Sequence, residues 1–448
     1  MLPITSIPMV MQSYFRGFQG IFNHPAQSRH FSELVTGRIV SKNKTIAGIQ
    51  QNLVMSSTSY DGLRRFTTRS SWSTDAVKDQ RLEWAKSKLC GQKEYPTVVS
   101  IDGTLVHHTG NQIDGVHKYF DYAEKKYCLG QRLILSCLAT PSQAIPLGHR
   151  LFRRGYLAEQ EEYLEEVYPD PEANEDKWQT YDELEKIYEQ NAANYKTHSD
   201  LARELVDECE HYKFHKDAYV VDAGLLTIEL ADHIESFDGA WISRLPKSRL
   251  VQATGSQFQS LLSFAKSLSK ESFQKTCVKT RHGEEREYWT FSKSVMVKDW
   301  KKLRIIISFD NEQIEGDPIF LVTNKKNWTQ HSKVLQLYLY RDPIEHLIRD
   351  EKQELGFESC QQRTREAVER HWELSFVAHT FLELGFNANP PAEVPTVAIE
   401  TLGQKSRMLA CEVLQDFVTL VRQLVLDERD TKEIVSKTST LRLNRLAC

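Results

Sequence analysis

The sequence lacks several features that would assign it to a specialised class of protein. Its 448 residues contain no run of 18 or more apolar residues, no Cys-x-x-Cys pair and no internal repeat or low-complexity tract. A membrane-spanning helix needs about 20 consecutive apolar residues, so the first absence excludes one. The eight cysteines are scattered without ligand-like Cys/His spacing, and reduced thiols in a cytoplasmic protein are their simplest account. The first 11 residues contain two prolines and no basic residue, unlike a signal peptide.

Charge is nearly balanced over the chain but strongly uneven along it. The net charge is −4, yet residues 159–189 hold 13 acidic residues against two lysines, a net of −11. Residues 244–304 hold 14 basic residues against five acidic ones, a net of +9. The basic segment predicts contact with a polyanion, because neutralisation of phosphates dominates nucleic-acid affinity. The alternative is that the two segments solvate different faces of the protein or face one another.

Residues 1–92 have few strand signals and predict a helical region. Two short amphipathic helices, within 44–53 and 60–66, are separated by a turn, which predicts a helix-turn-helix arrangement. Arg64 and Arg65 on the second helix would then be placed to meet DNA. The alternative is a helical bundle that binds nothing, since the same arrangement occurs in many such bundles.

From residue 95 the pattern changes to short apolar runs that are typical of strands. Three antiparallel strands, with a fourth run extending the meander, precede a helix, a strand, a helix and a strand. This is the element order of an RNase H-like fold. A basic, strand-rich segment follows, and then a mainly helical remainder. We therefore expect an α/β protein with five parts: a helical N-terminal DNA-binding domain (1–92), an RNase H-like core (93–246), a β-strand-rich insertion (247–335), a second core segment (336–385) and a helical C-terminal region (386–448).

Residues 338–352 carry the most informative pattern of the chain. Tyr338, Arg341, Glu345 and Lys352 form a Tyr-x2-Arg-x3-Glu-x6-Lys motif. At about 100° per residue, the four side chains fall within an arc of about 60° on one helix face. A phenol, a guanidinium, a carboxylate and an ammonium on one face suit a metal ion and a phosphate backbone.

The same residues are also compatible with an ordinary helix start. Asp342 would be the N-cap, Pro343 the first helical residue, and Glu345 the side chain that reaches back to the N-cap backbone. Glu345 and Arg349 would then form an i,i+4 pair worth about 0.3 kcal/mol. In that case the first two residues of the motif lie in the approach to the helix.

Two aspartates close apolar runs that we expect to lie side by side as parallel strands. Asp102 follows residues 96–101 and Asp222 follows residues 217–221, so both carboxylates would meet at the edge where open α/β sheets bind ligands. Carboxylates this close repel, and a divalent cation removes the conflict. Mg²⁺ prefers oxygen ligands, and two ions about 3.5–4 Å apart stabilise the attacking and leaving oxygens of a displacement at phosphorus. For either aspartate alone, the alternative is a turn residue at a strand end.

The motif at residues 338–352 resembles the one that holds the last catalytic acid in a large group of bacterial insertion-sequence DDE transposases, the Tyr-Arg-Glu-Lys (YREK) group. The resemblance covers roughly residues 30–385. The family's first motif, Asp-x-Thr at a strand end, matches Asp102-Gly-Thr104, and its second, an Asp followed closely by Gly, loosely matches Asp222-Ala-Gly224. The resemblance implies that Asp102, Asp222 and Glu345 are catalytic and hold two Mg²⁺ or Mn²⁺ ions.

The resemblance also implies how DNA is held. Tyr338, Arg341 and Lys352 would bind phosphates beside the scissile bond. Several members of the family close the flanking DNA as a hairpin, with a tryptophan of the insertion stacked on a flipped base. The candidates for stacking are Trp289, Trp300 and Trp328, for which the alternative is a packed residue of the β insertion. The basic insertion adds Lys298, Lys301 and Lys302 as expected phosphate contacts. His107 and His108 are expected to be surface or hydrogen-bonded histidines.

We therefore expect a transposase that cuts DNA at insertion-sequence ends with metal ions and joins the freed 3′-hydroxyl to target DNA. Its partners would be double-stranded terminal-repeat and target DNA, with a homodimer on the DNA and no membrane. We expect it in the bacterial cytoplasm, on the nucleoid when bound to DNA. The alternatives are a non-cutting DNA-binding protein derived from a transposase and a metal-dependent nuclease without strand transfer.

Overall fold

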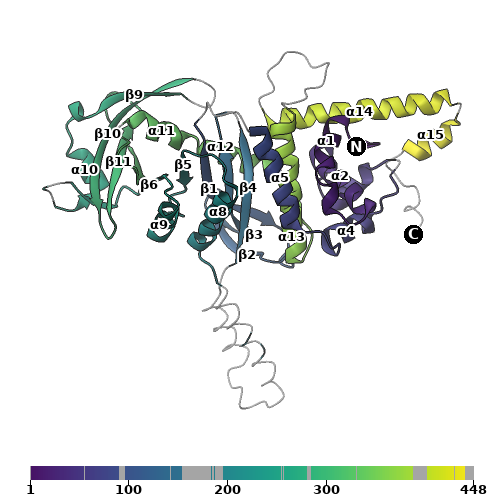
Figure 1. The fold of residues 1–448 in the computed structure, drawn as a ribbon, viewed down its shortest axis with the longest axis horizontal. Coiled ribbons are helices and arrows are strands. Elements are labelled where there is room, and N and C mark those ends of the chain that lie inside the picture. The colour runs from purple at the N-terminus through teal and green to yellow at the C-terminus, as the bar shows by residue number, and fades with distance from the viewer. Residues whose placement is uncertain are drawn as a thin grey trace.

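The computed structural model describes residues 2–54, 56–89, 96–141, 143–153, 183, 186, 195–253, 255, 257–279, 284–328, 330–386, 401–427 and 429–438. The sheet runs through the middle of the molecule, with the N-terminal helices at one end and the strands that follow residue 250 at the other (Figure 1). The acidic segment 159–189 lies outside the described residues, apart from Glu183 and Lys186. Among the described helices, none combines the length and the apolarity that crossing a membrane requires.

The N-terminal region is helical, as predicted. Its elements are α1 (Met9–Arg16), the 3₁₀ turn η1 (Gln19–Ile21), α2 (Pro25–Val40), α3 (Ile46–Asn52), α4 (Tyr60–Thr68) and α5 (Thr74–Leu89). The hydroxyl of Thr45 accepts a hydrogen bond from the backbone of Gly48 and so caps α3. The hydroxyl of Ser59 caps α4 in the same way, through Gly62. The two short helices of the predicted helix-turn-helix arrangement are therefore both present.

The core has the predicted RNase H-like order. Its elements are β1 (Val98–His108), β2 (His117–Asp121), β3 (Lys126–Ala139), β4 (Ala144–Phe152), α8 (His198–Tyr212), β5 (Ala218–Val221), α9 (Ile228–Ser236) and β6 (Trp241–Arg244). β1 is antiparallel to β3 and parallel to β5, and β5 is parallel to β6. Val98 and Val106 pack into one buried cluster while Val99 and Ile101 pack into another, so β1 is covered on both faces. The predicted fold class is confirmed.

The insertion continues the core sheet. Its elements are β7 (Leu250–Gln252), β8 (Gln259–Ser260), α10 (Leu261–Lys266), the 3₁₀ turn η3 (Lys270–Ser272), β9 (Gln274–Lys279), β10 (Glu285–Val297), β11 (Lys302–Phe309) and β12 (Ile319–Thr323). β12 is antiparallel to β6, which makes one sheet in the order β2-β3-β1-β5-β6-β12-β11-β10-β7-β8, with β4 beside β3 and β9 beside β10. Hydrogen-bonded strands thus cross the domain boundary predicted at residue 247, and that boundary stays a prediction.

The remaining helices join the two ends of the chain. They are α11 (His331–Leu339), α12 (Asp342–Gln353), α13 (Arg365–Thr380), the π-helical turn η4 (Phe381–Gly385), α14 (Leu402–Leu426) and α15 (Thr431–Thr438). α13, η4 and α14 pack against the N-terminal helices in one hydrophobic cluster that includes Phe31, Leu374 and Leu409. Inside it, Arg38 of α2 hydrogen-bonds His371 of α13 at 2.8 Å. The N-terminal helices therefore complete their core with residues more than 300 positions later.

A buried ion pair fastens this helical end to the sheet. Arg81 of α5 and Glu373 of α13 are 0% and 1% exposed, and Arg81 Nε lies 2.7 Å from Glu373 Oε1. Arg81 also donates to the backbone carbonyls of Pro146 and Leu147 in β4. One guanidinium thus connects the N-terminal helices, the core sheet and α13.

Candidate active site

Neighbouring parallel strands place Asp102 and Asp222 side by side. β1 and β5 pair from Val98 opposite Ala218 to Ile101 opposite Val221. The backbone N–H of Asp222 then donates to the carbonyl of Ile101 at 3.0 Å, so each aspartate is the first residue beyond the last parallel pair. One expectation was wrong: β1 does not end at Asp102 but continues to His108, and within the described residues this extension pairs with β3 alone.

Local backbone contacts orient the two carboxylates. Asp102 Oδ1 accepts from the N–H of Gly103 at 2.8 Å, and Asp222 Oδ2 accepts from the N–H of Gly224 at 2.8 Å. A side chain at Gly224 would stand 3.1 Å from that same oxygen, which explains why a glycine suits the turn. One oxygen of each aspartate remains directed away from its own turn.

Arg341 joins those remaining oxygens to the third acid of the motif. Its Nη2 donates to Asp102 Oδ2 at 2.7 Å and to Asp222 Oδ1 at 2.9 Å. Its Nη1 donates to Glu345 Oε1 at 2.9 Å. The side chains of Asp102, Asp222 and Glu345 are 13%, 34% and 55% exposed, so the group is partly buried on the strand side and open on the helix side. The structure thus brings all three predicted acids around one cation.

The motif does not lie on one continuous helix, contrary to the arc prediction. α11 ends at Leu339 and α12 begins at Asp342, so Tyr338 and Arg341 precede the helix that carries Glu345. The predicted capping interaction is not found among the described residues either: the N-cap of α12 is Arg341 instead of Asp342, and its side chain makes no capping hydrogen bond. Glu345 pairs with Arg341 instead of Arg349, whose partner is Asp350.

Tyr338 and Lys352 are both engaged within the protein. Tyr338 is only 5% exposed, and the guanidinium of Arg244 lies 5.2 Å from the centre of its ring. Lys352 Nζ donates to the carbonyl of Leu105 at 2.5 Å and lies 3.3 Å from Glu358, whose carboxylate accepts from the N–H of His107. Lys352 and Glu358 therefore satisfy the backbone of β1 along the edge that β5 leaves open.

Burial and charge shape the protonation of the site. Burial raises the pKa of Asp102 to about 6, with a further contribution from the nearby charges of Asp222 and Glu345, while Arg341 opposes the rise. Burial lowers the pKa of Arg341, but the charges of Asp102, Tyr338, Asp222 and Glu345 outweigh it, and the net pKa is raised. Burial and neighbouring acids both disfavour the charged form of a carboxyl group. A divalent cation bound beside Asp102 would stabilise that charged form.

The donor set fits a metal ion that prefers oxygen ligands. Asp102, Asp222 and Glu345 offer carboxylate oxygens of the kind that hold Mg²⁺. Within the described part of the chain, however, the three acids do not approach one another within 4.8 Å as a tight three-ligand group, because the guanidinium lies among them. Arg341 thus provides positive charge at the place where the resemblance puts metal ions.

Asp217, the other acid near β5, lies at the opposite end of the strand pair. Its Oδ2 accepts from the N–H of Thr97 at 3.0 Å, just before β1 begins. The parallel register therefore separates Asp217 from Asp222 by the length of β5 and leaves it outside the group around Arg341.

The predicted residues of the insertion differ in their availability. Lys298 and Lys302 are exposed, whereas Lys301 is held by Asp232 and Glu235 of α9, each at 2.7 Å. Trp300 is stacked on Trp241, with ring centres 5.5 Å apart and planes 3° apart. Trp289 and Trp328 are half-buried, each with a lysine above its ring, Lys275 at 5.9 Å and Lys333 at 4.8 Å. The packed-residue alternative thus describes Trp300 best.

The N-terminal arginines lie on the surface of α4. Arg65 is exposed, and Arg64 lies 3.4 Å from Asp61 in an i,i+3 pair. Arg64 also lines a pocket of about 450 Å³ together with Arg69 and Arg363. The DNA contact predicted for these residues stays a prediction.

One basic residue at the site was missed by the sequence reasoning. Arg244 ends β6, the next parallel strand beyond β5, and its guanidinium covers Tyr338. The available signal was similar to that for the aspartates, a polar residue at the end of a buried strand. His108, by contrast, fulfils its expectation as a hydrogen-bonded histidine, because its Nε2 contacts Gln131 at 2.8 Å.

An RNase H-like sheet with acids on adjacent parallel strands defines a class of nucleic-acid-cutting enzymes. The comparison with known proteins agrees: the family model described as DDE superfamily endonuclease matches residues 17–260, more than half of the chain. The chain belongs to this family. A second family model, described as Transposase DDE domain, matches residues 181–381. No curated protein matches the sequence.

Together the two matches assign the chain to transposase-type proteins that act on DNA, whose domains generally use divalent metal ions. They do not address the Tyr-Arg-Glu-Lys group, which stays a prediction.

Proposed function

We propose that the protein is a transposase that cuts DNA at the ends of an insertion sequence and joins the freed 3′-hydroxyl to target DNA. One observation carries the proposal: Asp102 of β1, Asp222 directly after β5 and Glu345 of α12 are far apart in the chain, yet all three contact Arg341. Ion pairs that are exposed to solvent contribute little to stability. Asp222 and Glu345 are 34% and 55% exposed, so stabilisation of the fold is a weak explanation for gathering three acids around Arg341.

In the proposed mechanism, Asp102, Asp222 and Glu345 would hold two divalent ions, which stabilise the attacking and leaving oxygens at phosphorus. Because the carboxylates would then bind the ions, the guanidinium of Arg341 would give up its hydrogen bonds to them. Its planar fork is suited to a phosphate, which it would grip through two hydrogen bonds. Arg341 would thus neutralise the acids before the ions bind and position the DNA afterwards.

The surface around the acids supplies further contacts for DNA. Arg244 would bind a phosphate beside Arg341. The buried ring of Tyr338 contacts the guanidinium of Arg244 and would help to hold both arginines in position. Lys352 would act indirectly, since it holds the open edge of β1 close to α12. Lys298 and Lys302 of the insertion, with Arg64 and Arg65 of α4, would bind phosphates at a distance from the cut. Trp289 and Trp328 remain the candidates for base stacking.

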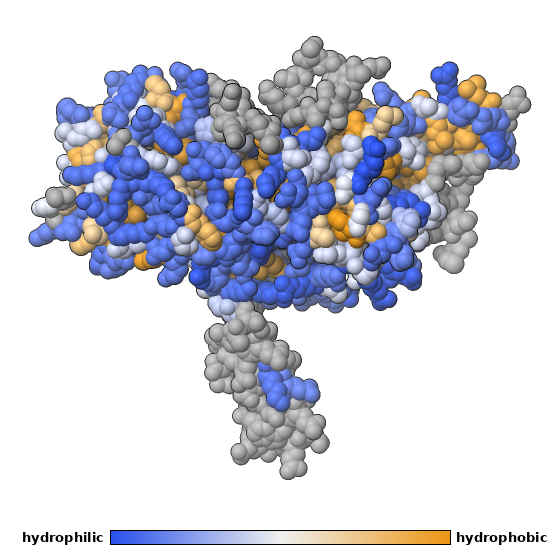
Figure 2. Space-filling model, in the orientation of Figure 1, coloured by the Kyte–Doolittle hydropathy of each residue, from blue (hydrophilic) through white to orange (hydrophobic). Residues whose placement is uncertain are grey.

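The predicted homodimer would use the outer half of α14. Figure 2 shows apolar side chains gathered at the end of the molecule formed by α14 and α15. Leu414, Val418, Val425 and Leu426 of α14 are 46% to 64% exposed. An apolar surface of this kind on a long helix is suited to a partner helix.

The decisive experiment incubates the purified protein with labelled insertion-sequence end DNA and a plasmid target, with and without Mg²⁺. We expect products in which the labelled end is joined to the plasmid, only with the ion. Cleavage without joining would instead establish a nuclease. A mobility shift without either product would establish a non-cutting DNA-binding protein.

Replacing Glu345 by glutamine should lower single-turnover cleavage by about two to three orders of magnitude. Glutamine still accepts a hydrogen bond from Arg341 but lacks the charge that a metal ligand needs, and the loss of several kcal/mol corresponds to this factor. Because the side chain is 55% exposed, the melting temperature should change little. Both quantities are measured on the same preparation.

The matched control is Glu369→Gln on α13. Glu369 forms the same i,i+4 pair with an arginine, Arg365, at 2.8 Å. It should retain the activity of the natural sequence. If the Glu345→Gln enzyme is active, Glu345 is not a catalytic residue, and its contact with Arg341 is an ordinary surface ion pair.

Reversing the charge of Lys298 and Lys302 together should weaken DNA binding and reduce its salt dependence. Each lysine that contacts a phosphate contributes about one to the slope of log affinity against log salt, so the double variant should lose about two. Fluorescence anisotropy with labelled duplexes at several salt concentrations measures the slope. The control reverses Lys118 and Lys126, exposed lysines on β2 and β3. An equal slope for the two double variants would contradict a DNA contact by the insertion.

A further inference from the structure

The strand register gathers three metal-ligating side chains on one face of the sheet, away from the three acids. On β3, Cys128 and Gly130 are two residues apart and so share a face. His107 of β1 is opposite Gly130, and Tyr119 of β2 is opposite Cys128. Asp121 is two residues after Tyr119 and therefore also shares this face. Because Gly130 has no side chain, nothing from that position separates the ring of His107 from Cys128.

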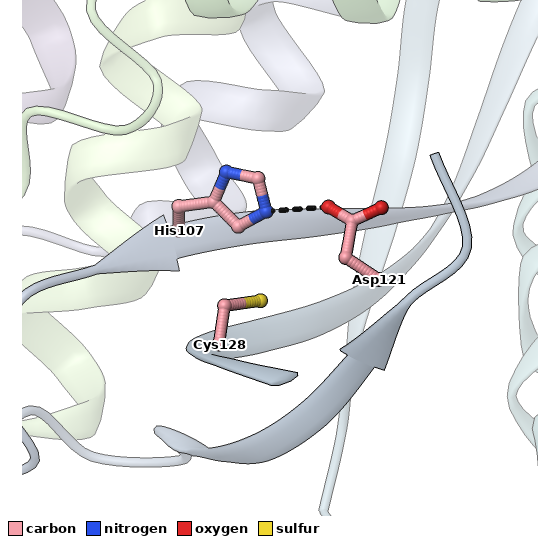
Figure 3. A group of neighbouring side chains, drawn as sticks. All are labelled: His107, Asp121 and Cys128. Atoms are coloured by element: carbon pink, nitrogen blue, oxygen red, sulfur yellow. Dashed lines mark hydrogen bonds and ion pairs between the residues drawn. The ribbon is translucent and has the colours of Figure 1, made fainter. Parts of the chain in front are cut away.

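The three side chains converge closely. One ligand atom from each of His107, Asp121 and Cys128 lies within 4.8 Å of the other two, the single group of this kind in the described part of the chain. His107 Nε2 is 2.8 Å from Asp121 Oδ2, and the sulfur of Cys128 points to the same space (Figure 3). His107 is 36% exposed and Asp121 12%, so an ion can reach the group from solvent.

Neighbouring groups hold the ligands in position. Asp121 Oδ1 accepts from the N–H groups of Ala123 and Glu124, at 2.8 and 3.1 Å, which leaves Oδ2 for a second contact. On the other side of the imidazole, Nδ1 of His107 faces the Glu358 carboxylate at 4.0 Å. Hydrogen-bonded carboxylates and a carboxylate behind a histidine are the usual supports of protein metal ligands.

We propose that His107, Asp121 and Cys128 form a zinc site that ties the β2–β3 hairpin to β1. A nitrogen, a carboxylate oxygen and a thiolate suit Zn²⁺, whereas the thiolate disfavours Mg²⁺. In a tetrahedral zinc site the ligand atoms stand about 3.4 to 3.6 Å apart, so Nε2 and Oδ2 need to separate only slightly. Binding releases the thiol proton of Cys128 to solvent. The fourth position is left to water.

The site would stabilise the part of β1 that lies beyond Asp102. In the described part of the chain this stretch of β1 has no parallel neighbour, and Lys352 and Glu358 form hydrogen bonds with its open edge. An ion held by β1, β2 and β3 together would add a link across three strands. This role is independent of DNA cutting, and so is the measurement that tests it.

The test removes all metal from the full-length protein with a chelator, adds Zn²⁺, desalts, and measures bound zinc by mass spectrometry. We expect about one zinc per chain. Cys128→Ser and His107→Ala should each weaken binding by more than about 100-fold, since the loss of a mere supporting residue already costs 10- to 100-fold. Co²⁺ should give a thiolate charge-transfer band that Cys128→Ser abolishes. Cys277→Ser, at an exposed cysteine of β9, and Asp102→Asn should leave both signals unchanged.

A second measurement needs no variant. Zn²⁺ should slow the alkylation of Cys128 in the natural sequence at least tenfold, while the exposed Cys277 reacts at an unchanged rate, as followed by peptide mass mapping. Zinc retention in Cys128→Ser equal to that in Cys277→Ser would overturn the site. So would alkylation of Cys128 that zinc does not slow, and His107 and Asp121 would then form an ordinary hydrogen bond within the sheet.

Discussion

Replacing Asp102 by asparagine is expected to lower single-turnover DNA cleavage by at least about three orders of magnitude and to leave the protein folded. Asparagine has nearly the same shape, and its single amide oxygen can still accept from the N–H of Gly103, although the contact of the other oxygen with Arg341 is lost. It lacks the charge that holds a metal ion, and losing several kcal/mol of transition-state stabilisation amounts to a factor of this size. Cleavage of labelled end DNA in Mg²⁺ and a thermal melt of the same sample measure the two effects.

Asp217→Asn is the matched control, because Asp217 lies on the same strand pair but at its other end, hydrogen-bonded to Thr97. It should cut DNA at the normal rate. The same loss as for Asp102 is expected for Asp222→Asn, and the double variant should be no worse than either single one, since the acids act as a unit. Appreciable Mg²⁺-dependent cleavage by Asp102→Asn would remove this residue from the site.

Replacing Arg81 by methionine is expected to destabilise the protein by about 3 to 5 kcal/mol, the cost of leaving one partner of a buried ion pair alone. The change leaves the buried carboxylate of Glu373, which is 1% exposed, without the cation that it pairs with. The carbonyls of Pro146 and Leu147 also lose the hydrogen bonds that Arg81 donates. Urea unfolding followed by circular dichroism measures the change in the free energy of unfolding, or the unfolding midpoint if the transition is not two-state.

Two further variants test the cause. Arg365→Met removes an arginine that is 68% exposed, also paired with a glutamate of α13, and should cost less than about 1 kcal/mol. The double variant Arg81→Met with Glu373→Leu should be more stable than Arg81→Met alone, because no charge is left buried. Equal stability of Arg81→Met and Arg365→Met would show that the buried pair contributes nothing to folding.

The sequence was sufficient to predict that Asp102 and Asp222 lie beside one another at neighbouring parallel strands, but not that β1 continues past Asp102 to His108. Both residues follow apolar runs, and parallel strands bring their carboxyl ends to one edge of a sheet, so local pattern and general topology were enough. The sequence was not sufficient for the conformation of the motif. Arg341 contacts the acids because the backbone breaks between α11 and α12, and a spacing of side chains alone does not distinguish one helix from two.

Contacts between distant parts of the chain could not be predicted from the sequence for a different reason. The partners of Lys301 are on α9, that of Trp300 is on β6, and those of His107 are on β2 and β3. Each pairing depends on which strands are neighbours and in what register. The predicted separate insertion likewise became part of one sheet through the pairing of β12 with β6.

The packing of α2 against α13 has a consequence for how the protein is made. The hydrogen bond between Arg38 and His371 spans 333 positions. At about 5 to 20 residues per second, a ribosome needs about 17 to 67 seconds to synthesise that length. During this interval the apolar side chains of the N-terminal helices lack the residues of α13 and α14 against which they pack in the folded protein. The N-terminal region, with the proposed DNA contacts of α4, therefore completes its core only after Asp102, Asp222 and Glu345 have been synthesised.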